Sequence, residues 1–231
     1  MTQLPYGSPA PTAFNARLRA LAERHCKRLA ALIAIWLGLT TLAAAQAPID
    51  VPAGTYTLEK THASLTWRIL HMGLSNYTAR FTRFDATLRF DPQDFSRSTV
   101  EASVDLASVE TDYIPVGGRD FNQDLRSADF FNVVQFPRAL FVSKKVTRTG
   151  PRTMRVDGNL TLLGVSQPLS LDVTLVGTLR AHPFAKVPAL GFSATASVPR
   201  LAFGLNPPAI REGVGAQAEI AIEAEFLSVG K

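Results

Sequence analysis

The chain has 231 residues, of which 46% are hydrophobic and 19% are charged, a composition too apolar for a disordered protein. Its formal net charge of +5 would suit an anionic partner such as nucleic acid, but the basic excess is confined to the N-terminus. Residues 1–45 hold five of the 24 basic side chains and one of the 19 acidic ones. The remainder of the chain is almost neutral, so we expect no nucleic-acid partner.

The N-terminal segment has the pattern of an export signal. Basic residues end at Lys27-Arg28, an uncharged apolar stretch follows over residues 29–43, and Ala43-Ala44-Ala45 supplies the small residues that a signal peptidase requires. We predict a signal peptide over residues 1–45, cleaved after Ala45. An uncleaved anchor is the alternative, because about 17 apolar residues is the lower limit for spanning a bilayer. The only cysteine, Cys26, lies in this segment, so we expect no disulfide in the remainder.

After a short lead-in over residues 46–53, apolar and polar residues alternate along most of the chain. Leu65, Trp67 and Ile69, for example, are separated by polar residues. A period of two is typical of half-buried strands. The predicted strands cover residues 65–69, 84–90, 100–106, 139–144, 154–162, 169–176, 191–198 and 218–226. Turn signals lie at Asp91-Pro92, Gly150-Pro151, Asp157-Gly158 and Pro207-Pro208. Eight or nine strands with short connections predict a single all-β domain, an antiparallel barrel or sandwich.

The alternation is lost between residues 111 and 137. Gly117-Gly118 comes first, and a short helix or 3₁₀ turn is predicted over residues 119–126. We expect this insertion, near residues 117–131, to cap one end of a barrel. Functional residues are often carried by such connections.

Signatures of common enzyme classes are missing from the sequence. It contains no Gly-x-Ser-x-Gly, no phosphate-binding glycine-rich loop, no His-Glu-x-x-His and no zinc-type cysteine pair. His62 and His71 are nine residues apart, so in one uninterrupted strand they would face opposite sides. We therefore expect no catalytic residues, no metal and no cofactor.

Polar residues of the irregular segment allow two interpretations each. Asp120, Asp124 and Asp129 have the chemistry of a general acid and base, but aspartates near helix ends commonly cap backbone N–H groups. Arg119 follows two glycines whose amides, with the guanidinium, would form an anion cradle. An arginine in an ion pair or in solvent is the alternative.

Aromatic residues are concentrated in one part of the chain. Most of the fourteen phenylalanines lie between Phe81 and Phe141, many with period-two spacing. Small barrels are often filled by side chains, and a packed core would account for this. The alternative is an interior lined around one elongated apolar ligand.

Several ordered motifs over residues 54–229 resemble the YceI-like family. They are Tyr56-Thr-Leu-Glu59, His62-Ala-Ser-Leu-Thr-Trp-Arg-Ile-Leu-His71-Met-Gly73, Phe81-Thr-Arg-Phe-Asp85, Arg119-Asp120, Leu125-Arg-Ser-Ala-Asp-Phe-Phe131, Phe136-Pro137, Phe141, and Gly158-Asn-Leu-Thr-Leu-Leu-Gly164 with Pro168. The resemblance implies a lipocalin-like antiparallel barrel, usually exported to the bacterial periplasm, that holds a polyisoprenoid or similar long amphiphile. No catalytic activity is generally attributed to this fold.

The chain also departs from the family pattern. Glu59 stands where the family commonly has Asp, Ala79 and Ala86 stand where it has Gly, and Asp124 stands where it has His. Two extra residues also separate Arg119-Asp120 from Leu125. Because an acidic Asp124 replaces a potential donor or cation, we expect weaker attraction for a diphosphate head group, and the identity of the head group stays open.

Together these patterns predict a periplasmic barrel that carries or stores a long-chain isoprenoid or fatty amphiphile, such as an isoprenoid quinone precursor. Alternation and the family motifs select the ligand-binding residues, with His71 and Arg119 orienting the head group at the mouth. The predicted residues are Trp67, Ile69, His71, Phe84, Leu88, Val104, Arg119, Phe131, Phe136, Phe141, Leu160 and Leu162.

Two other functions remain open from the sequence. One is a small hydrolase or isomerase using His71 with Asp120, which requires these side chains to meet in a cleft. The other is a filled barrel that acts as a structural or partner-binding module. Transient membrane contact and a homodimer are compatible with the sequence, which fixes neither.

Overall fold

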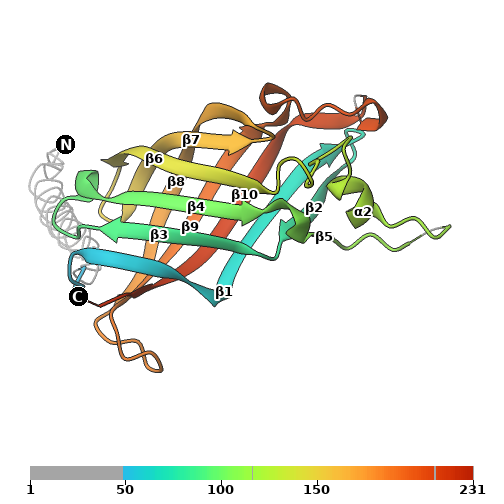
Figure 1. Ribbon diagram of the computed structural model, residues 1–231. Coiled ribbons are helices and arrows are strands. Elements are labelled where there is room, and N and C mark those ends of the chain that lie inside the picture. Colours follow the sequence, from blue (N-terminus) through green and yellow to red (C-terminus); the bar gives the residue numbers. More distant parts are fainter. Residues whose placement is uncertain (1–48, 116, 211, 231) are drawn as a thin grey trace, which may run out of the picture. The chain divides into compact units, whose positions relative to one another are not determined.

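The computed structural model describes residues 49–115, 117–210 and 212–230, and these form an antiparallel barrel (Figure 1). The predicted signal peptide lies outside the described residues. The described strands are β1 (Gly54–His71), β2 (Ser75–Phe81), β3 (Phe84–Phe90), β4 (Thr99–Asp105), β5 (Val109–Thr111), β6 (Arg138–Arg148), β7 (Thr153–Leu162), β8 (Val165–Leu179), β9 (Ala189–Pro199) and β10 (Val214–Ser228). Eight of them close the barrel in the order β10-β9-β8-β7-β6-β4-β3-β1, with β1 pairing back onto β10. The predicted antiparallel barrel of about eight strands is confirmed.

Strand β1 changes its partner half-way along. Residues 54–57 pair with β3, and residues 65–71 pair with β2, while β10 accompanies both halves. A register shift between Glu59 and Ser64 marks the change. Such irregularities bend and twist a strand. As a result β2, followed by β5, extends the sheet beyond the closed barrel at one end.

Strand β2 was not among the predicted strands, and neither was β5. Strand β2 follows β1 through a tight turn in which Met72 has φ 54° and Gly73 has φ 70°, and the Leu74 amide donates to the His71 carbonyl at 3.0 Å. These positive φ angles are those of a type I′ hairpin turn, for which glycine is well suited. Strand β5 has only three residues, too few to show a period.

One predicted turn is wrong. Asp157-Gly158 lies inside β7, where Gly158 pairs with Ser143 of β6 and with Leu169 of β8. The glycine is needed for a different reason. A Cβ built at residue 158 would lie 2.6 Å from Cζ of Phe141, so only a residue without a side chain lets this ring lie against the strand.

The irregular segment contains the short helix α2 (Phe121–Arg126), which confirms the helix predicted there. The Asp120 carboxylate accepts a hydrogen bond from the Gln123 amide at 3.1 Å, as an N-cap residue does. Two contacts attach α2 to β5: Asn122 Oδ1 accepts from the Thr111 amide at 2.9 Å, and Arg126 donates to the Val109 carbonyl at 3.1 Å. They hold α2 at the β5 end of the barrel (Figure 1).

Short 3₁₀ turns complete the described secondary structure. They are η1 (Phe95–Arg97), η2 (Leu106–Ser108), η3 (Arg200–Phe203) and η4 (Pro208–Ile210). Among the described helices, none has the length and apolar character that crossing a bilayer would require.

The interior is divided into two apolar clusters. The first fills the end of the barrel where β1 begins and β10 finishes, and its fully buried members include Tyr56, Leu175 and Leu190. Aromatic rings pack there edge to face, with Phe192 contacting both Phe90 and Phe226. The second cluster, which includes Phe81, Leu125 and Phe131, lies at the α2 end. The abundant phenylalanines therefore serve two clusters.

Candidate ligand cavity

A cavity of about 620 Å³ occupies the α2 end of the barrel. This volume lies within the range of about 300–1,000 Å³ typical of small-molecule sites. Its wall is built from inward-facing residues of β1, β2, β4, β6, β7, β8, β9 and β10, and α2 contributes Phe121 and Leu125. Among the described lining residues, only His71, Arg119, Arg200 and Glu212 carry ionisable groups other than tyrosine hydroxyls. The wall is otherwise almost wholly apolar, so it suits an elongated apolar molecule.

Nine of the twelve residues predicted to bind a ligand line this cavity. They are Trp67, Ile69, His71, Val104, Arg119, Phe131, Phe141, Leu160 and Leu162. Seven of them are inward side chains of the four strands β1, β4, β6 and β7, placed where alternation puts them, and Arg119 and Phe131 belong to the irregular segment. The structure assigns no ligand to any of them, so their part in binding stays a prediction.

Three predicted residues lie outside the lining. Leu88 belongs to the filled cluster at the far end of the barrel, because alternation fixes the face of a strand but not the height along the barrel axis. Phe84 packs between the two clusters. Phe136 lies outside the wall, where its Cε1 atom would be 2.8 Å from a Cβ built on Gly164, in the turn between β7 and β8.

Some lining residues were missed by the sequence prediction. Tyr77 and Phe81 alternate with polar residues of β2, so the same signal that revealed the other strands was present. Phe121 and Leu125 lie four residues apart on α2 and therefore share one face. Arg200 gave no signal, since it comes two residues after a predicted strand and looks like a surface residue.

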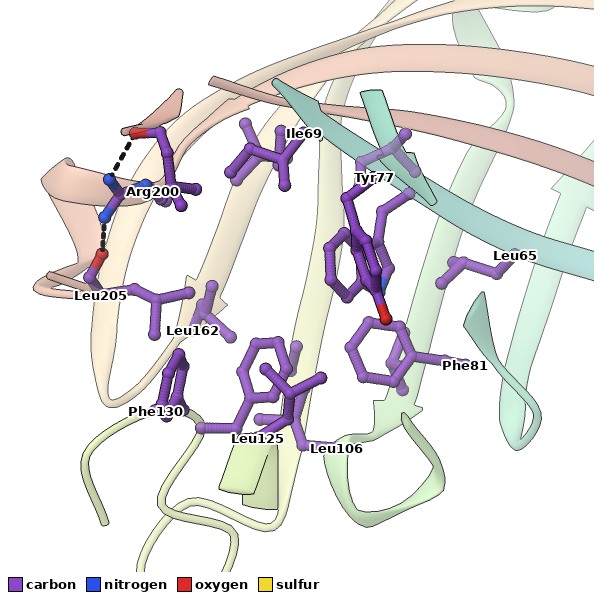
Figure 2. A pocket seen from close by; sticks show the side chains of 18 of the residues that line it. Leu65, Ile69, Tyr77, Phe81, Leu106, Leu125, Phe130, Leu162, Arg200 and Leu205 are labelled. Carbon is purple, nitrogen blue, oxygen red and sulfur yellow. Dashed lines mark hydrogen bonds between the residues drawn. The ribbon is translucent and has the colours of Figure 1, made fainter. Parts of the chain in front are cut away.

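Arg200 is buried, with 3% of its surface exposed, and it has no carboxylate partner among the described residues. Its guanidinium donates instead to three backbone carbonyls, those of Gly215 at 2.7 Å, Leu205 at 2.7 Å and Val214 at 2.9 Å. Figure 2 shows this group at the edge of the cavity. Burial lowers the pKa of Arg200 from its ordinary value, but so basic a group stays charged. Arg200 therefore ties η3 and its following loop to the start of β10.

Arg119, the predicted anion contact, is already paired. Its Nε donates to Oδ2 of Asp124 at 2.5 Å, and its guanidinium lies 5.3 Å from the centre of the Phe121 ring. The hydrogen bond that Arg119 donates to Asp124 raises the pKa of Arg119 above its ordinary value. The charge of Arg119 is therefore largely offset within the chain, and the mouth offers little net attraction to an anion.

His71 and Asp120 occupy different settings. His71 lies at the end of β1 and lines the cavity, whereas Asp120 caps α2 and is not part of the lining. No hydrogen bond or ion pair between these two described residues is present in the structure. The geometry gives no catalytic pair of the kind that the hydrolase alternative requires.

Glu59, His62 and Glu225 are the described residues whose arrangement comes nearest to a metal site, with their ligand atoms within 4.8 Å of one another. They lie at the register shift of β1, away from the cavity lining. The Glu59 carboxylate already accepts hydrogen bonds from Thr61 Oγ1 at 2.8 Å and from His62 Nδ1 at 2.6 Å. These bonds, chiefly the one from Thr61, lower the pKa of Glu59 to about 2. These hydrogen bonds lie within β1, at its register shift, and they already occupy the Glu59 carboxylate.

The fold is a closed antiparallel barrel with a hollow, almost wholly apolar interior, the architecture that some barrels use to enclose an apolar ligand. The sequence model of the YceI-like domain matches residues 56–226, and the chain belongs to the YceI-like family. A curated relative, Protein YceI of Salmonella arizonae, is 36% identical over 127 residues, a match that covers 54% of this chain and 63% of the relative. The chain thus spans less than two thirds of the length of that relative.

Two solved structures share the fold. BcnA of Burkholderia cenocepacia has a TM-score of 0.62 at 19% identity, and the match covers 73% of this chain and 98% of BcnA. A polyisoprenoid-binding domain from Saccharophagus degradans, implicated in plant cell wall breakdown, has a TM-score of 0.54 at 15% identity. That match covers 75% of this chain and 98% of the domain.

Proposed function

We propose that this protein carries or stores a long-chain isoprenoid or fatty lipid inside its barrel, and that it does so in the periplasm without catalysing a reaction. The observation that carries the proposal is the cavity of about 620 Å³ with an almost wholly apolar wall. A polyisoprenoid-binding domain shares the fold, which supports the same class of ligand. A completely filled structural barrel would have no such space.

The cavity volume limits the length of chain that is enclosed. Taking about 30 Å³ for each methylene-sized group, the share of a water molecule in the liquid, the cavity of about 620 Å³ holds roughly twenty carbon atoms. At about 0.8 kcal/mol per buried CH₂, this gives roughly 16 kcal/mol of gross stabilisation before the chain is ordered. We expect affinity to rise with chain length up to about this size and then to level off.

The direct test is native mass spectrometry of the purified protein, followed by extraction and identification of the released lipid. A reproducible isoprenoid or fatty lipid, at one molecule per chain, supports the proposal. Protein at its bare mass that also takes up no added polyprenyl lipid contradicts it.

A cavity-blocking variant separates interior binding from adsorption to the surface. Ala196 of β9 lines the cavity, and its neighbour Thr195 is exposed on the outer face. Ala196→Phe places a ring in the cavity and should strongly reduce lipid uptake, whereas Thr195→Phe adds the same ring outside and should not. Equal uptake by the two variants would show that the lipid lies elsewhere.

The periplasmic location rests on the sequence of residues 1–45. The test is the intact mass of the protein after cell fractionation. Periplasmic protein beginning at Gln46 supports cleavage after Ala45, and full-length protein in the membrane fraction supports the anchor.

A membrane surface is the source from which such a protein would take its lipid. Large apolar side chains are exposed beside lining residues at the α2 end: Met72 is 60% exposed, Leu74 87% and Ile114 80%. Met72 itself lines the cavity, and Leu74 and Ile114 lie close in the chain to the lining residues His71 and Tyr113. Replacing Leu74 and Ile114 with Ser should reduce cosedimentation with phospholipid vesicles and slow lipid transfer. Unchanged cosedimentation would exclude this surface as the contact.

A further inference from the structure

Two hydrogen-bond donors in the cavity wall have no partner. Nε1 of Trp67 and the hydroxyl of Tyr77 are both buried, and neither makes a hydrogen bond. Both residues line the cavity. Buried polar groups are almost always paired, because leaving one unpaired costs its desolvation energy. These two donors therefore need a hydrogen-bond acceptor, and the apolar side chains of the wall do not provide one.

The two donors belong to adjacent strands on the same face. Tyr77 of β2 stands opposite Ile69 of β1, two residues beyond Trp67, so Trp67 and Tyr77 are diagonal neighbours. Their ring centres are 6.4 Å apart. Figure 2 shows the side chain of Tyr77 among the lining residues.

The position of Tyr77 is fixed by packing. Its ring contacts Phe121 of α2 edge to face, with 5.8 Å between ring centres, and α2 is itself hydrogen-bonded to β5 through Asn122. The hydroxyl is therefore buried within the wall, where it has no hydrogen-bond partner among the described residues. Arg119 and Arg200, two other polar residues of the lining, differ, since Arg119 pairs with Asp124 and Arg200 pairs with backbone carbonyls.

We propose that Trp67 and Tyr77 form a hydrogen-bonding subsite for the oxygen of a neutral lipid, such as a ketone, ester or amide carbonyl. An indole N–H only donates, so the ligand atom that meets it must be an acceptor. No described cation is paired with this subsite, and burying an uncompensated anion in apolar surroundings is costly, which favours a neutral acceptor. This inference rests on the proposed function and specifies the chemistry of its ligand.

The test compares two probes that differ only in the acceptor, a long-chain methyl ketone and the alkane of the same length. Their partition between vesicles and protein is measured by mass spectrometry. The parent should prefer the ketone, and Tyr77→Phe should reduce ketone affinity about 2- to 10-fold, the range for one hydrogen bond between neutral groups, while alkane affinity stays unchanged. The control is Tyr113→Phe, because the Tyr113 hydroxyl also lies at the cavity but interacts with Arg119.

Trp67 provides a second readout. Trp36 and Trp67 are the two tryptophans of the sequence, so in the full chain carrying Trp36→Phe the indole signal comes from Trp67 alone. The ultraviolet resonance Raman band that responds to hydrogen bonding at the indole N–H should shift with the ketone and not with the alkane. The same shift with both probes would overturn the assignment of Trp67.

The outcomes separate the subsite from the proposed function. If neither probe binds the parent protein, the proposed function fails. If both bind and Tyr77→Phe keeps the ketone preference of the parent, the subsite is wrong and the lipid-binding function stands. Loss of stability of the empty Tyr77→Phe protein, with an unchanged ketone preference, would assign the hydroxyl a structural role through buried water instead.

Discussion

The ring of Phe141 lies against the backbone of β7 at Gly158. A Cβ added to Gly158 would approach Phe141 Cζ to 2.6 Å and the Val142 carbonyl oxygen to 2.5 Å. Phe141 also lines the cavity, so the missing side chain of Gly158 sets how far this ring projects into the interior. Replacing Gly158 with alanine, which adds one methyl group, therefore tests whether this glycine determines the position of the Phe141 ring in the wall.

Gly158→Ala should destabilise the protein by about 1–3 kcal/mol, because both the ring and a backbone carbonyl must move. The displaced ring should also reduce the capacity for long-chain lipid. Chemical denaturation and lipid uptake measure the two effects. Gly177→Ala is the matched control, since Gly177 also lies in a strand but has no atom within 4 Å of an added Cβ. Similar losses of stability and lipid uptake in both variants would show that they come from replacing a strand glycine in general, and not from the contact with Phe141.

The barrel strands could be predicted because each has one face in the interior and one in solvent, which imposes a period of two. The partner change of β1 could not be predicted, because the sequence around Glu59 and Ser64 does not show which strands lie beside these residues. Strand β2 was missed although Tyr77, Ala79 and Phe81 alternate, because Ser75 and Asn76 resemble turn residues.

The cavity itself was only partly predictable. Val104 and Leu88 both lie at inward positions, yet Val104 lines the cavity and Leu88 belongs to the filled end. The difference depends on height along the barrel axis, which is set by strand register and not by alternation. Arg200 could not be predicted because its partners are backbone carbonyls of distant residues. Asp120 was predictable as a cap, since its place before a short helix is a local property.

Arg200→Lys should be strongly destabilising although it preserves the charge. A lysine ammonium does not present the planar set of donors that reaches three carbonyls, so buried acceptors would lose their partners. We expect a loss of roughly 2–4 kcal/mol in the free energy of unfolding, measured by denaturant titration. Arg89→Lys, on the exposed face of β3, should change it by less than about 0.5 kcal/mol. A comparably small effect of Arg200→Lys would refute the structural role.

Glu59 should make part of the stability depend on acid pH. Its pKa is lowered from 4.5 to about 2 in the folded protein, chiefly by the hydrogen bond from Thr61. A group with a lowered pKa stabilises the fold above its unfolded pKa, and this contribution is lost as the pH falls through the folded pKa. Glu59→Gln should therefore be less stable than the parent above pH 4.5, and the difference should shrink as the pH falls toward about 2.

Denaturant unfolding across that pH range measures the difference directly. Glu101→Gln, which changes an exposed carboxylate of β4, is the control and should run parallel to the parent. A constant difference between Glu59→Gln and the parent at every pH would mean that ionisation of Glu59 is not responsible.

Asp124→Asn should change the preference of the protein for lipid head groups. Asp124 offsets the charge of Arg119 at the cavity mouth, so its neutralisation leaves the guanidinium available to an anion. The expected effect is modest, an increase of up to about 5-fold in affinity for a fatty acid relative to its methyl ester, because exposed ion pairs contribute only about 0.2–1 kcal/mol. Added salt should reduce it, since screening weakens interactions between exposed charges. Competition between acid and ester at low and high salt provides the measurement.

Asp129→Asn removes a nearby exposed carboxylate that has no ion pair in the described structure, and it should leave the ratio of acid affinity to ester affinity unchanged. If both variants raise the ratio equally, the general charge of this end of the barrel, and not Arg119, determines the preference.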